Sequence, residues 1–329
     1  MRKYFWMLFI TVGCDTSTDA NVHGTADRTF RARGELIWTD SLLGGDVQDA
    51  LIVDSNVVLL DQAQGQLRAL SLVDGRRMWI AGRKGAGPGE FASPVSLVWI
   101  AEGRFVVIDT RQGRASLFSS NGLPLEQLVG SATALDLHTG CASGDGMFLS
   151  VNMPRSQLVQ VGRTGSIARE DSLVWPEAPM NEYALFRQGM FARARGGPCV
   201  LISTRGGYFA VLDSLPVSQA TFRPYLSKYA YPPKIGERNG QPVFAPAGTA
   251  AYWAVRDGGL LYILADGPGD SKAQLLDVYD VARGSYLYSI KLAHPAFIFD
   301  VSGDRLLVID DTEGGSRVSL YQLSSPGRK

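Results

Sequence analysis

The stretch PVSLVWIAEGRFVVIDTRQGRASLF, residues 94–118, contains three short apolar segments separated by two tight polar turns. The segments 96–100, 105–109 and 114–118 are rich in Val, Ile, Leu and Phe, which favour β-strands. Glycine stands in both intervening stretches, as is typical of turns. This part of the chain therefore predicts three consecutive strands of one antiparallel sheet.

The same unit recurs along the chain at intervals of roughly 40–60 residues, a spacing typical of propellers and solenoids. Its most regular part is a second strand that ends in a polar residue. These second strands are VVLLD ending at Asp61, FVVID at Asp109, FLSVN at Asn152, CVLIST at Thr204, LYILAD at Asp266 and LLVID at Asp310. Third strands follow in all six copies, and fourth strands in the first five. We therefore expect an all-β fold, a six-bladed antiparallel β-propeller.

The two ends of the repeat region complement each other. The segment GELIWTD, residues 34–40, precedes the first copy, whereas the sixth copy ends near Leu323 without a fourth strand. We predict that 34–40 supplies the missing strand and closes the ring in the last blade. Closure protects sheet edges that would otherwise pair with other chains. The expected propeller domain covers residues 34–329.

One copy resembles a known family. Residues 82–122 are similar to the repeat signature of NHL-type six-bladed propellers, in which a glycine-rich loop leads through a proline to an inner strand. The resemblance implies a six-bladed propeller, and it extends to bacterial lipoproteins of similar length, layout and leader. The matching positions are Gly85, Gly87, Pro88, Gly89, Glu90, Phe91, Pro94, Asp109, Arg114, Phe118 and Gly122.

The N-terminus has the layout of an export signal: basic residues, an apolar run over 4–12, and then a Gly-Cys pair. The run is shorter than the ~20 residues of a membrane-spanning helix. Residues 11–14 (TVGC) resemble the lipobox of bacterial lipoproteins, although Thr11 stands where that family usually has Leu. The resemblance implies a signal peptide over 1–13 and lipidation of Cys14. The alternative is a secreted protein whose cleaved peptide ends near this cysteine.

These features predict a location at the bacterial cell envelope, lipid-anchored to a membrane and facing the periplasm or the exterior. Residues 14–33 are small and polar, and we expect them to form a flexible tether. The chain has 32 basic and 32 acidic residues, and its formal charge of zero argues against a nucleic-acid partner. We expect the membrane contact to be through the lipid alone.

Motifs for metals and catalysis are sparse. The chain has three histidines and neither a His-Glu-x-x-His nor a Gly-x-Ser-x-Gly motif. The carboxylates Asp61, Asp109, Asp266 and Asp310 recur at one place in the repeat, where we expect them to cap the following turns. The alternative is a ring of carboxylates that binds a calcium ion at the mouth of the pore. We expect no bound cofactor, with calcium as the alternative.

Cys141 and Cys199 are the two cysteines that remain besides Cys14. An exported protein meets an oxidising compartment, where disulfides form. Both residues lie before or at second strands of adjacent copies. A disulfide between them and two separate thiols are both open interpretations.

Two long stretches, 175–189 and 222–249, interrupt the repeat. Both join a fourth strand to the next first strand, so we expect them on the same face as the turns between second and third strands. Long loops in compact folds are often functional, and aromatic and arginine side chains suit sugars, peptides and carboxylates. Alternatively, these loops cover the pore and shield blade edges. The predicted ligand-binding residues on this loop-rich face are Arg83, Lys84, Arg111, Arg155, Arg205, Tyr229 and Tyr231.

Fold alone does not choose a function for a propeller. We favour a non-enzymatic binding or interaction scaffold, a monomer that holds an envelope protein, peptide or glycan on the loop-rich face. One alternative is a lyase or hydrolase with a metal near the central pore. Another is an assembly module, whose mark would be an exposed apolar patch. The missing catalytic motifs favour the scaffold.

Overall fold

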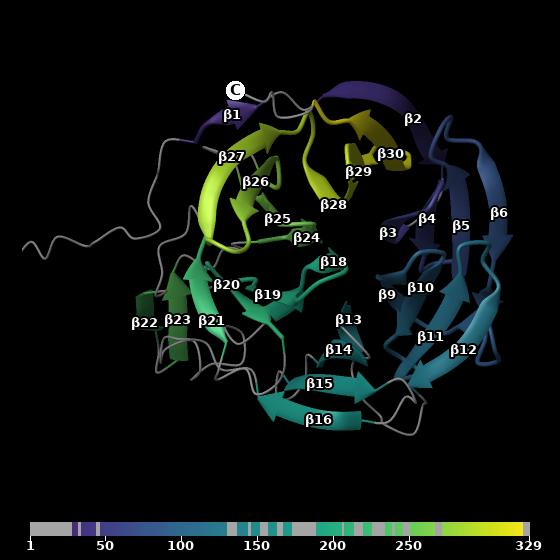
Figure 1. Cartoon of the computed structure of the whole chain (residues 1–329), viewed down its shortest axis with the longest axis horizontal. Coiled ribbons are helices and arrows are strands. Elements are labelled where there is room, and N and C mark those ends of the chain that lie inside the picture. Colours follow the sequence, from purple (N-terminus) through teal and green to yellow (C-terminus); the bar gives the residue numbers. More distant parts are fainter. Residues whose placement is uncertain are drawn as a thin grey trace, which may run out of the picture.

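The computed structural model describes most of the chain between residues 28 and 324. All regular structure in this part is β-strand, so it contains no helix that could span a membrane. The sheets stand around a central axis, and each extends from an inner strand to an outer strand (Figure 1). The expected signal peptide and Cys14 lie outside the described residues. The described ranges are 28–31, 34–43, 47–129, 137–143, 146–151, 157–162, 167–172, 189–205, 207–213, 220–225, 234–238, 241–245, 251–266 and 272–324.

Five of the sheets are four-stranded antiparallel blades. The first blade contains β3 (Val47–Val53), β4 (Asn56–Asp61), β5 (Gln66–Ser71) and β6 (Arg77–Ala81). The second contains β9 (Pro94–Ala101), β10 (Arg104–Asp109), β11 (Arg114–Ser119) and β12 (Pro124–Val129). The third contains β13 (Leu137–Ser143), β14 (Gly146–Val151), β15 (Gln157–Gly162) and β16 (Ile167–Ser172). The fourth contains β17 (Gly189–Phe191), β19 (Cys199–Ser203), β20 (Tyr208–Leu212) and β21 (Thr221–Pro224).

The fifth of these blades closes the ring, and we call it the closing blade. Its strands are β28 (Ala296–Ser302), β29 (Arg305–Thr312), β30 (Gly315–Gln322) and β2 (Glu35–Leu43). Two further sheets are short two-stranded pairs. They are β7 (Arg83–Lys84) with β8 (Glu90–Phe91), and β22 (Lys234–Arg238) with β23 (Gln241–Ala245).

The sheet between the fourth blade and the closing blade has six strands and is mixed. Its two end strands, β1 and β18, pair in parallel with their neighbours β27 and β24. The prediction of six antiparallel blades is therefore wrong, because the described residues form five four-stranded blades and this larger sheet. Its order is β1 (Phe30–Arg31), β27 (Ser285–Lys291), β26 (Leu275–Asp280), β25 (Leu260–Ala265), β24 (Trp253–Asp257) and β18 (Arg193–Arg195).

The extra inner strand arises because the inner strand of the fourth blade divides. β17 pairs with β19, and the Ala192 N–H still donates to the Val200 carbonyl at 2.8 Å. The chain then leaves the fourth blade, and β18 aligns Arg193 with Val255 of β24. One inner strand is thus shared between two neighbouring sheets, which a repeat of equal blades does not allow for.

The extra outer strand comes from the segment before the ring. Residues 28–31, expected at the end of a flexible tether, lie along β27, where Phe30 pairs with Ser289. The Arg28 guanidinium contacts the buried Asp277 carboxylate of β26 through Nε and Nη2, at 3.1 and 3.0 Å. A charge-assisted bond of this two-pronged kind fixes geometry as well as adding energy. The propeller therefore holds this segment against its outer edge.

The predicted pairing of the N-terminal strand with the last copy is confirmed. β2 pairs along its length with β30, the last strand of the chain. Trp38 of β2 is buried, and its indole Nε1 donates to the Leu72 carbonyl of the first blade at 3.2 Å. Gly75 accommodates the ring, because a Cβ at this position, where φ is +71°, would lie 3.0 Å from the indole. The closing strand therefore contacts both blades that meet at the junction.

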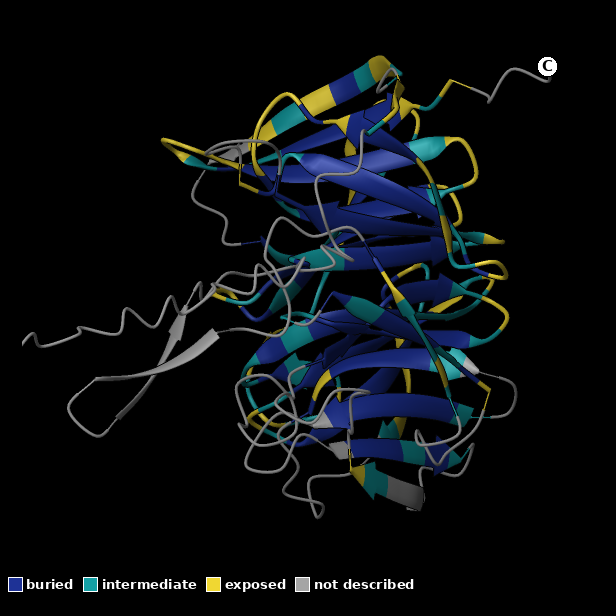
Figure 2. Ribbon diagram, turned by 90° about the vertical axis from the view of Figure 1, so that its left-hand side faces the viewer, coloured by how far each residue is buried: buried dark blue, intermediate teal, exposed yellow. Residues whose placement is uncertain are grey.

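The apolar core consists of clusters between neighbouring sheets. Between the first and second blades, for example, Val53 and Leu60 pack with Phe105 and Phe118, whose rings stack with centroids 5.8 Å apart. Figure 2 shows buried strands through the middle of the molecule and exposed turns at its two ends. Burial of this kind is the main favourable term in folding. The exposed turns are therefore the natural places for binding.

Trp38→Ala is expected to lower the free energy of unfolding by about 3–5 kcal/mol, because it removes a buried aromatic ring at the closing junction. Urea denaturation followed by circular dichroism measures the loss. Leu36→Ala is the matched control, since Leu36 lies on the same strand but is 48% exposed, and it should change stability by less than about 0.5 kcal/mol. Equal losses in the two variants would contradict a role for Trp38 in closure.

Candidate functional site

The predicted cations Arg83 and Lys84 form β7, which pairs in parallel with β8. Arg83 donates through Nε to Glu90 Oε1 at 2.7 Å, and Glu90 also accepts the Gly87 N–H at 2.9 Å. The Gly87 N–H and the Arg83 guanidinium hold the pKa of Glu90 below its ordinary value. These contacts close the glycine-rich loop on itself as the crossing between the first and second blades.

Arg114 of β11, another residue of the NHL-like signature, binds the same loop from its inner side. Arg114 is buried and donates to the carbonyls of Ala86 and Gly87, both at 3.2 Å, and to that of Glu90. Each carbonyl gains a charge-assisted partner, which stabilises an otherwise irregular loop. The signature residues therefore have a structural role in this chain.

The other predicted cations are spread around the ring. Arg111 is exposed in the turn between β10 and β11, and Arg205 lies in the turn between β19 and β20 of the fourth blade. Arg155, Tyr229 and Tyr231 lie outside the described residues. Arg111 lies at the same blade junction as Arg83 and Lys84, because its neighbour Gln112 donates to the Gly85 carbonyl at 2.6 Å, whereas Arg205 lies on the fourth blade. A binding role for the loop-rich face stays a prediction.

The four aspartates that end second strands are buried and bonded within their own sheets. This confirms the expected turn caps at Asp61 and Asp109. The regions that the structure describes hold no group of three His, Cys, Asp or Glu side chains placed to bind a metal ion. Asp61 accepts the Gln64 N–H at 2.8 Å, Asp109 the Gln112 N–H at 3.1 Å, Asp266 the Ala273 N–H at 2.9 Å, and Asp310 the Arg317 Nε–H at 2.8 Å.

Four charged residues that sequence reasoning missed meet at the inner strands, and we call them the central network: Arg193, Arg195, Asp49 and Asp300. Arg193 of β18 is 3% exposed and donates to the Asp49 carboxylate of β3 and to the Ala50 carbonyl. Its Nη1 lies 3.6 Å from Oδ1 of Asp300 on β28, which also accepts a bond from Arg195. β18 is thereby tied to the first blade and to the closing blade at once.

The charges of the central network neutralise one another. Burial alone would lower the pKa of Arg193, but the neighbouring Asp49 and Asp300 carboxylates raise it above its ordinary value. Arg195 also donates to the Val301 carbonyl at 2.9 Å. Asp49 and Asp300 near the axis are therefore paired with guanidinium groups, and within the described part of the chain Oδ1 of Asp300 is left without a hydrogen-bond partner.

Polar side chains on inner strands also accept N–H groups from the next sheet around the ring. An inner strand is an edge, so its unpaired N–H groups need partners when they are buried. Such partners are found at three of the junctions between neighbouring blades. Asp300 accepts the Ile52 N–H at 2.7 Å, Asp49 the Leu97 N–H at 2.6 Å, and Thr139 the Phe191 N–H at 3.0 Å.

The sequence contains a pattern that could have identified the residues of the central network. Asp49 and Asp300 stand within otherwise apolar strands, and Arg193 and Arg195 alternate with Ala in the stretch MFARAR, residues 190–195. Charged residues are almost never fully buried unless they are paired. Charges inside strands that must face the axis therefore predict a buried ionic cluster, although the pattern does not identify the partners.

Arg193→Met is expected to lower the free energy of unfolding by about 3–5 kcal/mol, because it leaves a buried carboxylate without its counter-charge. Urea denaturation measures this loss. The double variant D49N/R193M should be more stable than R193M, since it removes the uncompensated charge as well. Arg283→Met is the control: its guanidinium is 81% exposed and should contribute less than about 1 kcal/mol. If R193M and R283M lost equally little, the central network would have no structural importance.

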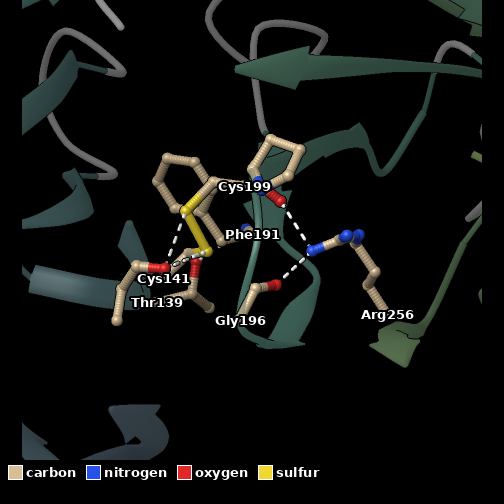
Figure 3. The surroundings of a disulfide bond; sticks show 8 residues. Thr139, Cys141, Phe191, Gly196, Cys199 and Arg256 are labelled. Atoms are coloured by element: carbon tan, nitrogen blue, oxygen red, sulfur yellow. Dashed lines mark hydrogen bonds between the residues drawn. A yellow bond between two sulfur atoms is a disulfide. The ribbon is translucent and has the colours of Figure 1, made fainter. Parts of the chain in front are cut away.

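Cys141 and Cys199 are joined by a disulfide that links β13 of the third blade to β19 of the fourth. Figure 3 shows that Arg256 of β24 points at the turn before Cys199, where its Nη1 donates to the Gly196 carbonyl and, at 3.1 Å, to the Pro198 carbonyl. The disulfide and the hydrogen bonds from the Arg256 guanidinium thus meet at one turn. This turn connects the third blade, the fourth blade and the six-stranded sheet.

Exposed large apolar side chains concentrate on the first two blades. Of the eight in the described residues, five lie on the first two blades. The turn before β12 lies against Trp79 of β6, because a Cβ on Gly122 would meet the Trp79 ring at 2.7 Å. Met78 and Ile80 alternate with Trp79 along β6, so they point to the other face of this strand. Both β6 and β12 are outer strands with one unpaired edge. We call the exposed large apolar residues of these strands and of the turn before β12 the apolar outer surface: Met78, Ile80, Leu123 and Leu125.

Comparison with known proteins supports a propeller. Residues 28–140 match the family model described as outer membrane protein assembly factor BamB, which is not the NHL-type group that residues 82–122 resemble. None of the curated proteins matches the chain. A Bacteroides fragilis protein described as exported shares 12% identity with a TM-score of 0.54, covering 88% of this chain and 94% of its own. Virginiamycin B lyase of Staphylococcus aureus shares 9% identity with a TM-score of 0.51, covering 87% of this chain and 99% of its own.

Proposed function

We propose that this protein is a non-enzymatic scaffold of the cell envelope that docks another envelope protein on its apolar outer surface. The observation that carries the proposal is the position of that surface. Met78 and Leu123 are 59% and 62% exposed, and they lie on adjacent blades within the segment that matches the BamB family model. Exposed large apolar side chains on neighbouring outer strands favour an interaction site on this side of the ring.

The outer strands suit a protein partner better than a small ligand. β6 and β12 offer unpaired edges, and Ile80 and Leu125 stand beside them with exposed fractions of 47% and 52%. A convex strand surface encloses little of a small molecule, whose sites are concave. A second protein can instead cover the apolar side chains and protect the strand edges. The proposed partner is therefore a folded or extended envelope protein.

The triple variant M78E/I80E/L125E is expected to lose its partner when the lipid-anchored protein is purified from its own membranes, because each glutamate would be buried without a counter-charge on docking. Copurification followed by mass spectrometry identifies the partner. Leu287→Glu is the matched control, since Leu287 is also an exposed apolar strand residue, 39% exposed, but lies on β27.

The proposal requires that one envelope protein accompany both the unchanged chain and L287E. Retention of that protein by the triple variant, with unaltered folding by circular dichroism, would exclude the apolar outer surface. The absence of any envelope protein from the unchanged chain would contradict the scaffold itself.

The proposed anchor is a lipid on Cys14, supported by the lipobox-like residues 11–14 and by the match to an envelope family model. Cys14→Ser is expected to move the protein from the membrane fraction to a soluble or unprocessed form, because two or more acyl chains are needed for stable anchoring. Fractionation with labelled fatty acid measures the change. A Cys14→Ser protein that remained membrane-bound would contradict lipidation at this residue.

A further inference from the structure

A cleft of about 450 Å³ lies between the fourth blade and the six-stranded sheet. It opens among the turns that join first to second and third to fourth strands, at the opposite end of the ring from Asp61 and the other strand-end aspartates. Its volume is within the range of roughly 300–1,000 Å³ that small-molecule sites occupy. The side chains that matter for its chemistry are Leu212, Asp213, Arg223, Arg256 and Val281.

Arg256 provides a fixed cation in the wall of the cleft. It is 8% exposed, and the carbonyls of Gly196 and Pro198 hold its Nη1 in place (Figure 3). Burial lowers its pKa, and nearby Asp257 opposes this. Its Nε is buried and has no hydrogen-bond partner among the described residues. The acceptors of the Arg256 guanidinium are neutral carbonyl oxygens. Among the described residues, no hydrogen-bonded carboxylate therefore neutralises its charge.

Arg223 of β21 adds a second cation from the other side of the cleft. Its side chain lies on the turn at Gly284, where a Cβ would come within 2.4 Å of the arginine Cδ. Its Nε is also buried without a partner, and the guanidinium forms no ion pair within the regions that the structure describes. Arg223 as a whole is partly exposed, so its guanidinium is a cation open to the cleft. An anion in the cleft would give it a hydrogen-bonded counter-charge.

The charge and the walls of the cleft define the ligand class. Arg223 and Arg256 bring two positive charges, and exposed Asp213 at the edge brings one negative charge, so a single negative charge balances the site. The planar guanidinium fork matches the geometry of a carboxylate. Leu212 and Val281 offer apolar contact to a hydrocarbon body.

We propose that this cleft binds a small organic monocarboxylate, with its carboxylate at Arg223 and Arg256 and its apolar part against Leu212 and Val281. The cleft and the apolar outer surface lie on different sheets, so this site does not depend on the proposed docking function. It is a ligand site of the fold itself, beside the turn at Pro198 that precedes the disulfide-bonded Cys199.

The test uses hexanoate as the probe, with its uncharged amide, hexanamide, and inorganic phosphate as comparisons. Hexanoate at millimolar concentration should raise the melting temperature of the full chain, because it binds only the folded state. Hexanamide and phosphate should not. Equal effects of hexanoate and hexanamide, or no effect of hexanoate, would overturn the proposal.

Arg223→Gln should weaken hexanoate binding at least about tenfold, because it removes a charge-assisted hydrogen bond to the carboxylate. Titration calorimetry measures the affinity. The same variant should keep the melting temperature of the unchanged chain, because Arg223 is partly exposed and forms no ion pair among the described residues, whereas loss of a structural arginine would lower it. Arg283→Gln, on the exposed turn beside the cleft, is the control and should bind hexanoate normally. Unchanged binding by R223Q would refute the site.

Discussion

The inner strand of each sheet presents an unpaired edge to the axis of the ring, and the partners of those edges organise the rest of the structure. Asp300, Asp49 and Thr139 accept N–H groups from the sheet that follows their own. Arg193 and Arg195 add donors that reach backbone carbonyls and carboxylates of two other sheets. Because a buried polar group without a partner is costly, these contacts specify which sheets stand next to one another.

The occupied centre explains where binding is to be expected. Propellers often offer their axis to ligands, but here guanidinium groups and carboxylates already neutralise one another near the axis. The surfaces that remain for binding lie farther from the axis. The first two blades expose apolar side chains on their outer strands, and the boundary between the fourth blade and the six-stranded sheet holds a cleft with two arginines. A single fold can therefore serve a protein partner and a small ligand at separate places.

Local sequence patterns predicted the second strands well, because an apolar run that ends in a turn-capping aspartate is decided by neighbours in the chain. β4 and β10 follow this rule. The inner strand of the third blade is less evident, because β13 (Leu137–Ser143) has the sequence LHTGCAS, which shows little apolar character. Its position is decided by pairing with β14 rather than by its own composition.

Apart from the pairing of β2 with β30, long-range pairing was beyond the reach of the sequence. β18 joins β24, and Arg193 finds Asp49 at a separation of 144 residues, so no local repeat records either contact. The same holds for the cleft, since Arg223 and Arg256 come from different sheets. The predicted cations on the loop-rich face were chosen by their place in the repeat alone. Their partners, such as Glu90 for Arg83, became clear only from the folded loop.

The union of β2 with β30 also governs when the protein can fold. Strands at the two ends of the chain must meet, and Glu35 pairs with Gln322. Contacts of such sequence separation form late and slowly, because a long loop must close before they stabilise anything. A ring of this kind cannot be completed on a growing chain until its last strand has emerged. Until β30 has been made, the ring therefore remains open at the junction that β2 later closes.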